Sequence, residues 1–172
     1  MMNKQTLAMI WDHLRQMNGI TLRLIENLPA DQLDARPIPT MRTPKELLVH
    51  LYSTLRYSAE GILSGSIPDW DEKAICESIR TKADLARLAT ESWNAASHAI
   101  DQVTDAQLAA TVNTPWNFTM PGHYCVQVIR DEATHHRGQL FTFVRALGGD
   151  VPMMWDFEHN APEFQPKAHA TA

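Results

Sequence analysis

The chain has 172 residues, of which 44% are hydrophobic and 20% are charged, as in ordinary globular proteins. This length predicts one domain at residues 1–164 with a flexible tail at 165–172, and it argues against a disordered chain. The net charge of −5 argues against nucleic acid as a partner, because phosphate contacts need clustered Lys and Arg. Two cysteines and no apolar run of membrane-spanning length exclude a disulfide framework and a membrane segment, so we expect a cytoplasmic protein.

The first predicted helix runs from about Lys4 to Leu28. Apolar residues recur along it at spacings of three and four, which is the pattern of a helix with one buried face. Pro29 ends the helix, because proline cannot continue its hydrogen bonding. Two more prolines follow before Met41, so this stretch is predicted to be a connector.

The second predicted helix begins with an unusually clear signal. Thr43 is a good N-cap, proline follows at the first helical position, and Glu46 completes a capping box. Apolar residues then recur on one face as far as Leu63. We expect the helix to end there, because Gly65 and a second proline follow.

A connector from Gly65 to Arg80 leads to the third predicted helix, from about Thr81 to Val103. This connector exceeds the usual length between helices of a bundle, so it could permit a crossover instead of a tight hairpin. Beyond the helix, Thr104 to Leu108 can form one short capped turn. The stretch from Thr111 to Thr119 is the only plausible extended segment.

The fourth predicted helix runs from about Pro121 to Leu147 and is stopped by two glycines. Gly138 lies inside it and needs an explanation, either close approach of another helix's backbone or space for the metal cavity. The segment from Val151 to Phe164 is too apolar for a free tail and should fold back across the bundle or a partner subunit. The fold class is therefore all-α: a four-helix bundle with long connectors and an irregular C-terminal segment.

Three polar residues lie on apolar helix faces. Glu132 and His136 are four residues apart, so their side chains stack on one face of the fourth helix. A carboxylate on a buried face needs a partner, and a metal ion is an efficient one. His50, on the apolar face of the second helix, is the best third ligand. This set suits a divalent ion such as zinc, nickel or iron and leaves positions open for water or substrate.

Simpler interpretations of these residues stay open. A Glu and a His four apart can form an ordinary helix-surface pair, and a lone apolar-face histidine is more often a hydrogen-bonded core residue. The three together could also be a hydrogen-bonded cluster with no metal. In that case a chelator would leave the melting temperature unchanged.

Two segments resemble the DinB/YfiT-like family of metal-dependent proteins: His-His-Arg-Gly-Gln-Leu at 135–140 and Glu-Leu-Leu-Val-His-Leu at 46–51. The layout as far as about Gly149 is also similar. The family typically binds its metal through one histidine on the second helix and an H-x-x-x-H pair on the fourth. By position these ligands correspond to His50, Glu132 and His136. Glu132 departs from the usual histidine, which implies a more anionic site or a degenerate one.

Further candidates surround this set. His135 is an alternative ligand or proton carrier, Cys125 a pocket residue or reactive thiol, and Glu46 a hydrogen-bond partner of His50. Each also has a purely structural alternative. His135 would be a partly exposed polar residue, Cys125 a small core residue and Glu46 a helix cap. Core packing is the default for the larger aromatic side chains, with pocket lining as the alternative: Tyr52, Tyr57, Trp93 and Trp116.

The resemblance implies a divalent-metal-binding protein. Its reaction classes would be thiol-dependent S-transfer or isomerisation, with a low-molecular-weight thiol as cosubstrate, or hydrolysis. It also implies a homodimer, for which the apolar C-terminal segment would supply a surface. The alternative is a stress-response protein that binds a metal or small ligand without turnover.

Overall fold

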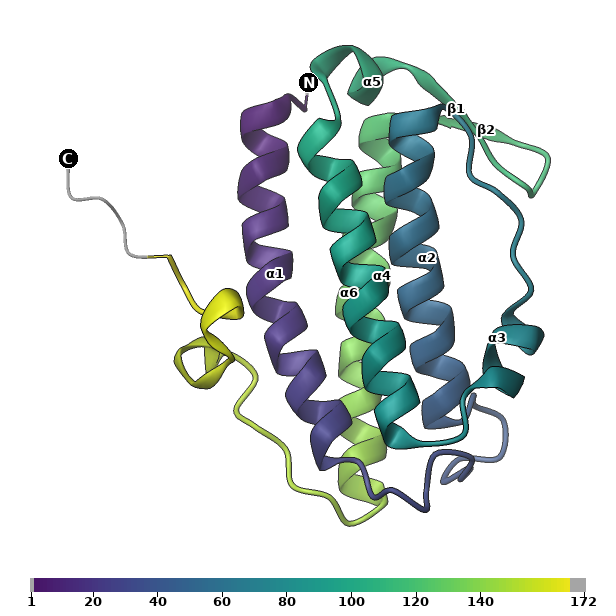
Figure 1. Cartoon of the computed structure of the whole chain (residues 1–172), viewed down its shortest axis with the longest axis vertical. Helices are drawn as coiled ribbons and strands as arrows, with labels where there is room; N and C mark the ends of the chain where they lie inside the picture. Colours follow the sequence, from purple (N-terminus) through teal and green to yellow (C-terminus); the bar gives the residue numbers. More distant parts are fainter. Residues whose placement is uncertain (1, 168–172) are drawn as a thin grey trace.

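The computed structural model describes residues 2–167, whose main feature is a bundle of four long helices (Figure 1). Helix α1 spans Lys4–Asn27, α2 Pro44–Ser64, α4 Lys82–Gln102 and α6 Gly122–Ala146. Each boundary lies within one residue of the predicted one. The all-α four-helix bundle is therefore confirmed.

The order of the helices around the bundle determines which side chains can meet. Helices α1 and α2 each pack mainly against α4 and α6, so α1 and α2 occupy opposite corners. Figure 1 shows α1 and α6 running downward and α2 and α4 running upward. Because α2 and α4 are parallel, the segment between them must cross back along the length of the bundle. The crossover that the connector length allowed is thus present.

This crossover connector is not wholly irregular. Residues Glu72–Ser78 form a short helix, α3, which packs against α2. Asp71 caps it by accepting a hydrogen bond from the amide of Ala74 at 3.0 Å. With seven residues and no fully buried side chain, α3 had too little periodicity to be predicted.

The expected extended segment is a small hairpin. After the short helix α5, Asp105–Ala109, strands β1, Thr111–Asn113, and β2, Thr119–Pro121, pair antiparallel. Asn117 adopts a left-handed conformation, φ 60°, between them, which lets the chain reverse. Thr119 is therefore the start of a second strand and not the end of a single one.

The predicted capping box of α2 is present. The amide of Glu46 donates to Thr43 Oγ1 at 3.1 Å, and the amide of Thr43 donates to the Glu46 carboxylate at 2.8 Å. This reciprocal pair satisfies two amides that a helix start otherwise leaves free. It fixes where α2 begins, and so the register of His50.

The C-terminal segment folds back on the chain's own bundle, along α1. Two 3-10 turns, Phe157–His159 and Pro162–Phe164, contact this helix. Arg23 pairs with Asp156 at 2.8 Å, and Asn160 donates to a carbonyl of α1. The last five residues of the expected flexible tail, 168–172, lie outside the described residues.

Gly138 has neither of the predicted explanations. A Cβ built at this position meets nothing within 4 Å, so no helix approaches closely there. The residue is exposed and lies away from the side of α6 that faces α2. Nothing in the structure explains its choice over alanine.

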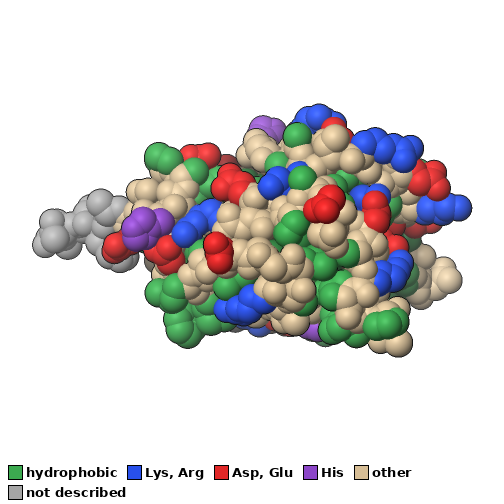
Figure 2. Space-filling view, turned by 90° about the horizontal axis from the view of Figure 1, so that it is seen from below, with side chains coloured by type: hydrophobic (Ala, Val, Ile, Leu, Met, Phe, Trp, Pro, Cys, Tyr) green, Lys and Arg blue, Asp and Glu red, His purple; other side chains and the backbone are tan. Residues whose placement is uncertain are grey.

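The charged side chains are spread over the surface. In the view from below, Figure 2 shows acidic and basic side chains interspersed, with neither sign gathered into a continuous patch. Among residues 2–167, no helix is both long enough and apolar enough to cross a membrane.

The buried side of α6 carries apolar residues up to Ile129 and again from Leu140. Between these two positions the helix presents polar groups to its neighbours.

Candidate metal centre

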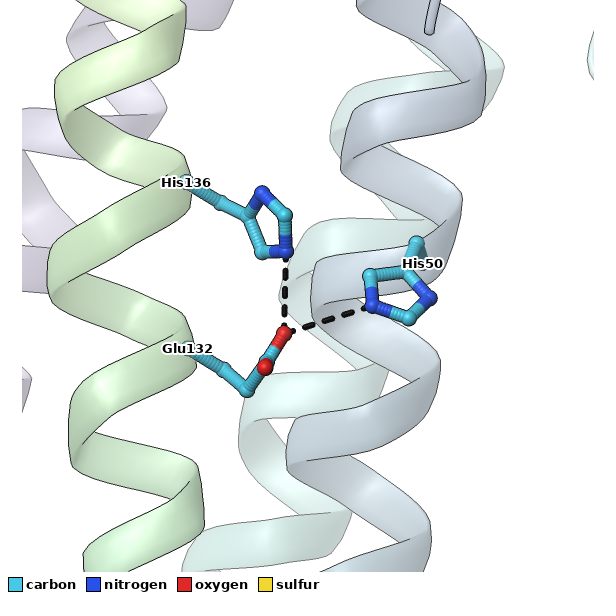
Figure 3. A group of neighbouring side chains, drawn as sticks. All are labelled: His50, Glu132 and His136. Carbon is cyan, nitrogen blue, oxygen red and sulfur yellow. Dashed lines mark hydrogen bonds and ion pairs between the residues drawn. The ribbon is translucent and has the colours of Figure 1, made fainter.

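The interruption in the apolar face of α6 contains Glu132 and His136, and His50 faces them from α2 (Figure 3). The two residues of α6 are one helical turn apart, which stacks their side chains on one face. Helices α2 and α6 are direct neighbours in the bundle. The structure therefore brings together the three residues that the sequence singled out.

One carboxylate oxygen is the meeting point of the three side chains. Glu132 Oε2 lies 2.9 Å from Nε2 of His136 and 3.3 Å from Nε2 of His50. Each residue offers one ligand atom, and these atoms all lie within 4.8 Å of one another. In a tetrahedral zinc site, with bonds of about 2.1 Å, ligand atoms would lie about 3.4 Å apart. The two separations from Glu132 Oε2 are close to this value, so the donor atoms already lie near coordinating positions.

The second nitrogen of each imidazole also has a partner. Nδ1 of His50 lies 2.6 Å from Oε1 of Glu72, at the start of α3. Nδ1 of His136 lies 2.7 Å from the side-chain oxygen of Gln139, one turn further along α6. Because both partners accept hydrogen bonds, they favour a proton on Nδ1. In the neutral ring each Nε2 is then left with a lone pair directed at the common centre, whereas in the protonated ring Nε2–H donates to Glu132.

The electrostatics show strong mutual stabilisation. Hydrogen bonds from His136 and His50 hold the pKa of Glu132 well below its usual range, although burial opposes the shift. The approach of Glu132, and then that of Glu72, raises the pKa of His50 against the effect of burial. Without a metal, this arrangement favours a proton on His50 between two carboxylates. A divalent cation at this point would displace that proton and bring two positive charges in place of one.

Burial differs among the three residues. The side chain of His136 is only 7% exposed, whereas those of His50 and Glu132 are 21% and 33% exposed. His136 therefore lies at the closed end of the site, and the other two residues face outward. Such a site is anchored in the bundle and is accessible from one side.

Beside the centre, at His50, lies a cavity of about 560 Å³, which Glu132 and His136 do not line. His50 forms part of its wall, and the rest comes from the crossover connector, the start of α3 and the hairpin: Asp69, Trp70, Asp71, Glu72 and Trp116. Trp116 is 51% exposed, so the core role expected of it by default is wrong and the pocket alternative holds. Tyr52 and Trp93 are buried in the core as expected.

The other candidate residues lie outside the three-residue centre. His135 is exposed, and its ring contacts that of His136 with 4.9 Å between centroids. Cys125 is fully buried, and burial raises the pKa of its thiol to about 11, which disfavours a reactive thiolate. Glu46 bonds to Thr43 and Arg36, and its described hydrogen bonds do not include His50.

Sequence reasoning missed the two residues that orient the imidazoles. Gln139 could have been found, because it follows His136 by three residues and so lies on the same helical face. Glu72 carried no such signal, because it is 22 residues from His50 along the chain. Only the return of the crossover connector along α2 brings it to the site.

Two imidazoles and a carboxylate thus meet at one point from facing helices. Helical bundles build metal sites in this way, so the protein is a helical bundle with a candidate metal centre. Residues 13–140 match the model of the DinB superfamily. The chain therefore belongs to the DinB superfamily, and the resemblance seen in the sequence is confirmed.

Relatives share this fold. The uncharacterised protein YjoA of Bacillus subtilis is 25% identical over 141 residues, covering 81% of this chain and 89% of YjoA. The crystal structure of that DinB-like protein has a TM-score of 0.69 at 24% identity, covering 85% of this chain and 96% of YjoA. A DinB-like protein from Bacillus cereus has a TM-score of 0.69 at 18% identity, covering 87% of this chain and 95% of its own.

A third solved structure is YfiT of Bacillus subtilis, described as "a probable metal-dependent hydrolase with an unusual four-helix bundle topology". Its TM-score is 0.68 at 17% identity, covering 87% of this chain and 92% of YfiT. At this identity the similarity shows the shared fold.

Proposed function

We propose that this protein binds one divalent transition metal through His50, Glu132 and His136 and is a metal-dependent enzyme. The observation that carries the proposal is the convergence of two imidazole nitrogens and a carboxylate oxygen on one point. With Nδ1 of each ring engaged elsewhere, all three converging atoms are acceptors, and three acceptors in contact require a cation or a proton between them. Two nitrogens and an oxygen suit zinc, nickel or ferrous iron.

The open side of the centre favours catalysis over simple metal storage. Three protein ligands leave coordination positions free, and the cavity beside His50 gives a small molecule access to them. A metal bound there would lower the pKa of a coordinated water or thiol and polarise a substrate. The C-terminal segment lies along α1 and so leaves the cavity open, against the alternative of a sealed structural or storage site.

Family membership supports two proposals for the reaction class. We propose hydrolysis, the activity named for YfiT, or transfer or isomerisation that depends on a low-molecular-weight thiol. The homodimer stays a prediction, and the exposed apolar side chains that the C-terminal segment offers to it are Met153, Met154 and Trp155.

The first prediction concerns metal content. Protein made without a histidine tag and incubated with zinc, nickel or ferrous iron should hold about one ion per chain after desalting, as measured by elemental analysis. His50→Ala and His136→Ala should each lose it, because two ligands hold a divalent ion far more weakly than three. His135→Ala is the matched control, since this exposed neighbour should not affect metal content.

Circular dichroism on the same samples separates loss of metal from loss of fold. If the unsubstituted protein takes up none of the three metals stoichiometrically, the proposal is wrong. If His135→Ala loses the ion and His136→Ala keeps it, the ligand set is wrong.

A further inference from the structure

The cavity beside His50 has a distinctive chemical lining that the metal centre does not explain. Three of its six lining residues carry carboxylates, two are tryptophans, and none is a lysine or arginine. Its volume of about 560 Å³ lies within the range of small-molecule sites, which span about 300–1,000 Å³. This cavity therefore has room for an organic ligand in contact with His50.

The aromatic wall is held in place by a chain of ring contacts. Trp70 stacks on Tyr57 of α2, with 5.2 Å between ring centroids. Trp116, near the tip of the hairpin, meets Trp70 edge-on at 5.9 Å and stacks on Phe118 at 6.0 Å. Trp116 and Phe118 are each 51% exposed, so the hairpin holds large rings open to solvent. The supporting contacts fix the indoles before any ligand arrives.

The carboxylates add negative charge on the same wall. Asp69 and Asp71 each use Oδ1 to accept a hydrogen bond from a backbone amide. Among the described residues, their Oδ2 atoms have no hydrogen-bond or ion-pair partner in the protein. Glu72 is engaged by His50, and a guanidinium, that of Arg42, lies 3.7 Å from its carboxylate.

Together these features select the charge of the ligand. An ammonium group is attracted to the electron-rich face of an indole and to carboxylates at once, and both attractions grow as water is displaced. An anion would meet the carboxylates with like charge. A neutral apolar molecule would bury them without a partner. The three carboxylates and Glu132 carry four negative charges, so the surroundings would stay net negative even when Arg42 and a divalent metal are counted.

We propose that this cavity binds an organic cation, a small molecule carrying a protonated or quaternary amine. Its charged nitrogen packs against Trp70 and Trp116 and faces Asp69 and Asp71, and the rest of the molecule extends toward His50. Where this ligand is the substrate, the inference rests on the proposed metal centre. Binding of the cation by the aromatic and acidic wall does not depend on it.

Isothermal titration calorimetry on the full chain tests this inference. The probes are choline and hexyltrimethylammonium, the neutral choline isostere 3,3-dimethylbutan-1-ol, and the anion butyrate. Both cations should bind to the metal-free and to the zinc-incubated protein. The neutral isostere should bind at least about 10-fold more weakly than choline, and butyrate should not bind detectably.

Pocket variants provide the structural control. Trp116→Leu and Asp69→Asn, both exposed and outside the core, should each weaken choline binding by about 5- to 30-fold. Trp155→Leu, an exposed tryptophan that does not line this cavity, should leave it unchanged.

The inference is overturned if neither cation binds in either state, if the neutral isostere binds as tightly as choline, or if Trp155→Leu weakens binding as much as Trp116→Leu. Elemental analysis of the same samples keeps the two proposals separate. Cation binding by a protein that takes up no metal would support this inference and contradict the metal proposal. Metal uptake without binding of an organic cation would support the metal proposal and contradict this inference.

Discussion

The candidate centre depends on which nitrogen of each imidazole is free. In His50 and His136, Nδ1 is held by a neighbouring oxygen and Nε2 points at Glu132. An imidazole with this arrangement is already in the tautomer and orientation that a metal needs. Glu72 should affect metal binding more than Gln139 does, because its negative charge also makes Nε2 of His50 a stronger electron-pair donor to a metal.

Removing Glu72 should therefore weaken metal binding without removing a ligand. Glu72→Ala should lower zinc affinity by about 10- to 100-fold in a competition titration with a chromophoric chelator. Glu72→Gln should recover part of the loss, because its amide oxygen can still accept the proton of Nδ1. Glu77→Gln is the control, since Glu77 is exposed on the same short helix and pairs with Lys73. Equal losses in Glu72→Ala and Glu77→Gln would show that Glu72 does not orient His50.

At the scale of elements, α6 combines a packing role with the functional one. Its glycines show how differently two positions of one helix are constrained. At Gly122 a Cβ would lie 2.4 Å from the carbonyl oxygen of Gln107, whereas at Gly138 it would meet nothing. The start of α6 must be glycine for steric reasons, and its middle is free of that constraint.

These positions predict opposite effects of alanine. Gly138→Ala should stabilise the protein by about 0.5–1 kcal/mol, because alanine loses less backbone entropy in a helix. The melting temperature should then rise by about 1–4 °C. Gly122→Ala should destabilise by about 1–3 kcal/mol, because backbone must move to admit the methyl group. A lower melting temperature for Gly138→Ala would mean that its surface is covered in solution.

For the whole molecule, the centre links two helices that are distant in the chain. His50 and Glu132 are separated by the crossover, α4 and the hairpin, and meet only in the folded bundle. A metal bound to both α2 and α6 therefore binds the native state in preference to the unfolded chain, and its binding energy adds to stability.

Metal loading should consequently raise the melting temperature. At free zinc about 1,000-fold above the dissociation constant, the gain is about 4 kcal/mol, or about 8–16 °C for a chain of this size. Adding a chelator should reverse the shift, and His50→Ala should show none. Differential scanning calorimetry provides the measurement. A melting temperature that neither zinc nor chelator changes would instead support a hydrogen-bonded cluster without metal.

Much of this architecture follows from local rules. Apolar periodicity and capping residues predict the boundaries of α1, α2, α4 and α6, because the start and end of a long amphipathic helix are marked by residues within and next to it. The same periodicity placed Glu132 and His136 on one face and indicated His50 as their partner. The family resemblance gave independent support for His50 and His136, with Glu132 at the position where the family usually has histidine.

The tertiary structure decided what lies between the helices. The seven residues of α3 are too few to hold a helix without packing against α2, and the hairpin depends on one left-handed residue. Glu72, Trp70 and Trp116 meet His50 only because the crossover connector and the hairpin return to the same side of the bundle. Contacts between residues distant along the chain leave no periodic signal. The candidate metal ligands were therefore readable from the sequence, whereas the partner that orients His50 and the wall of the cavity were not.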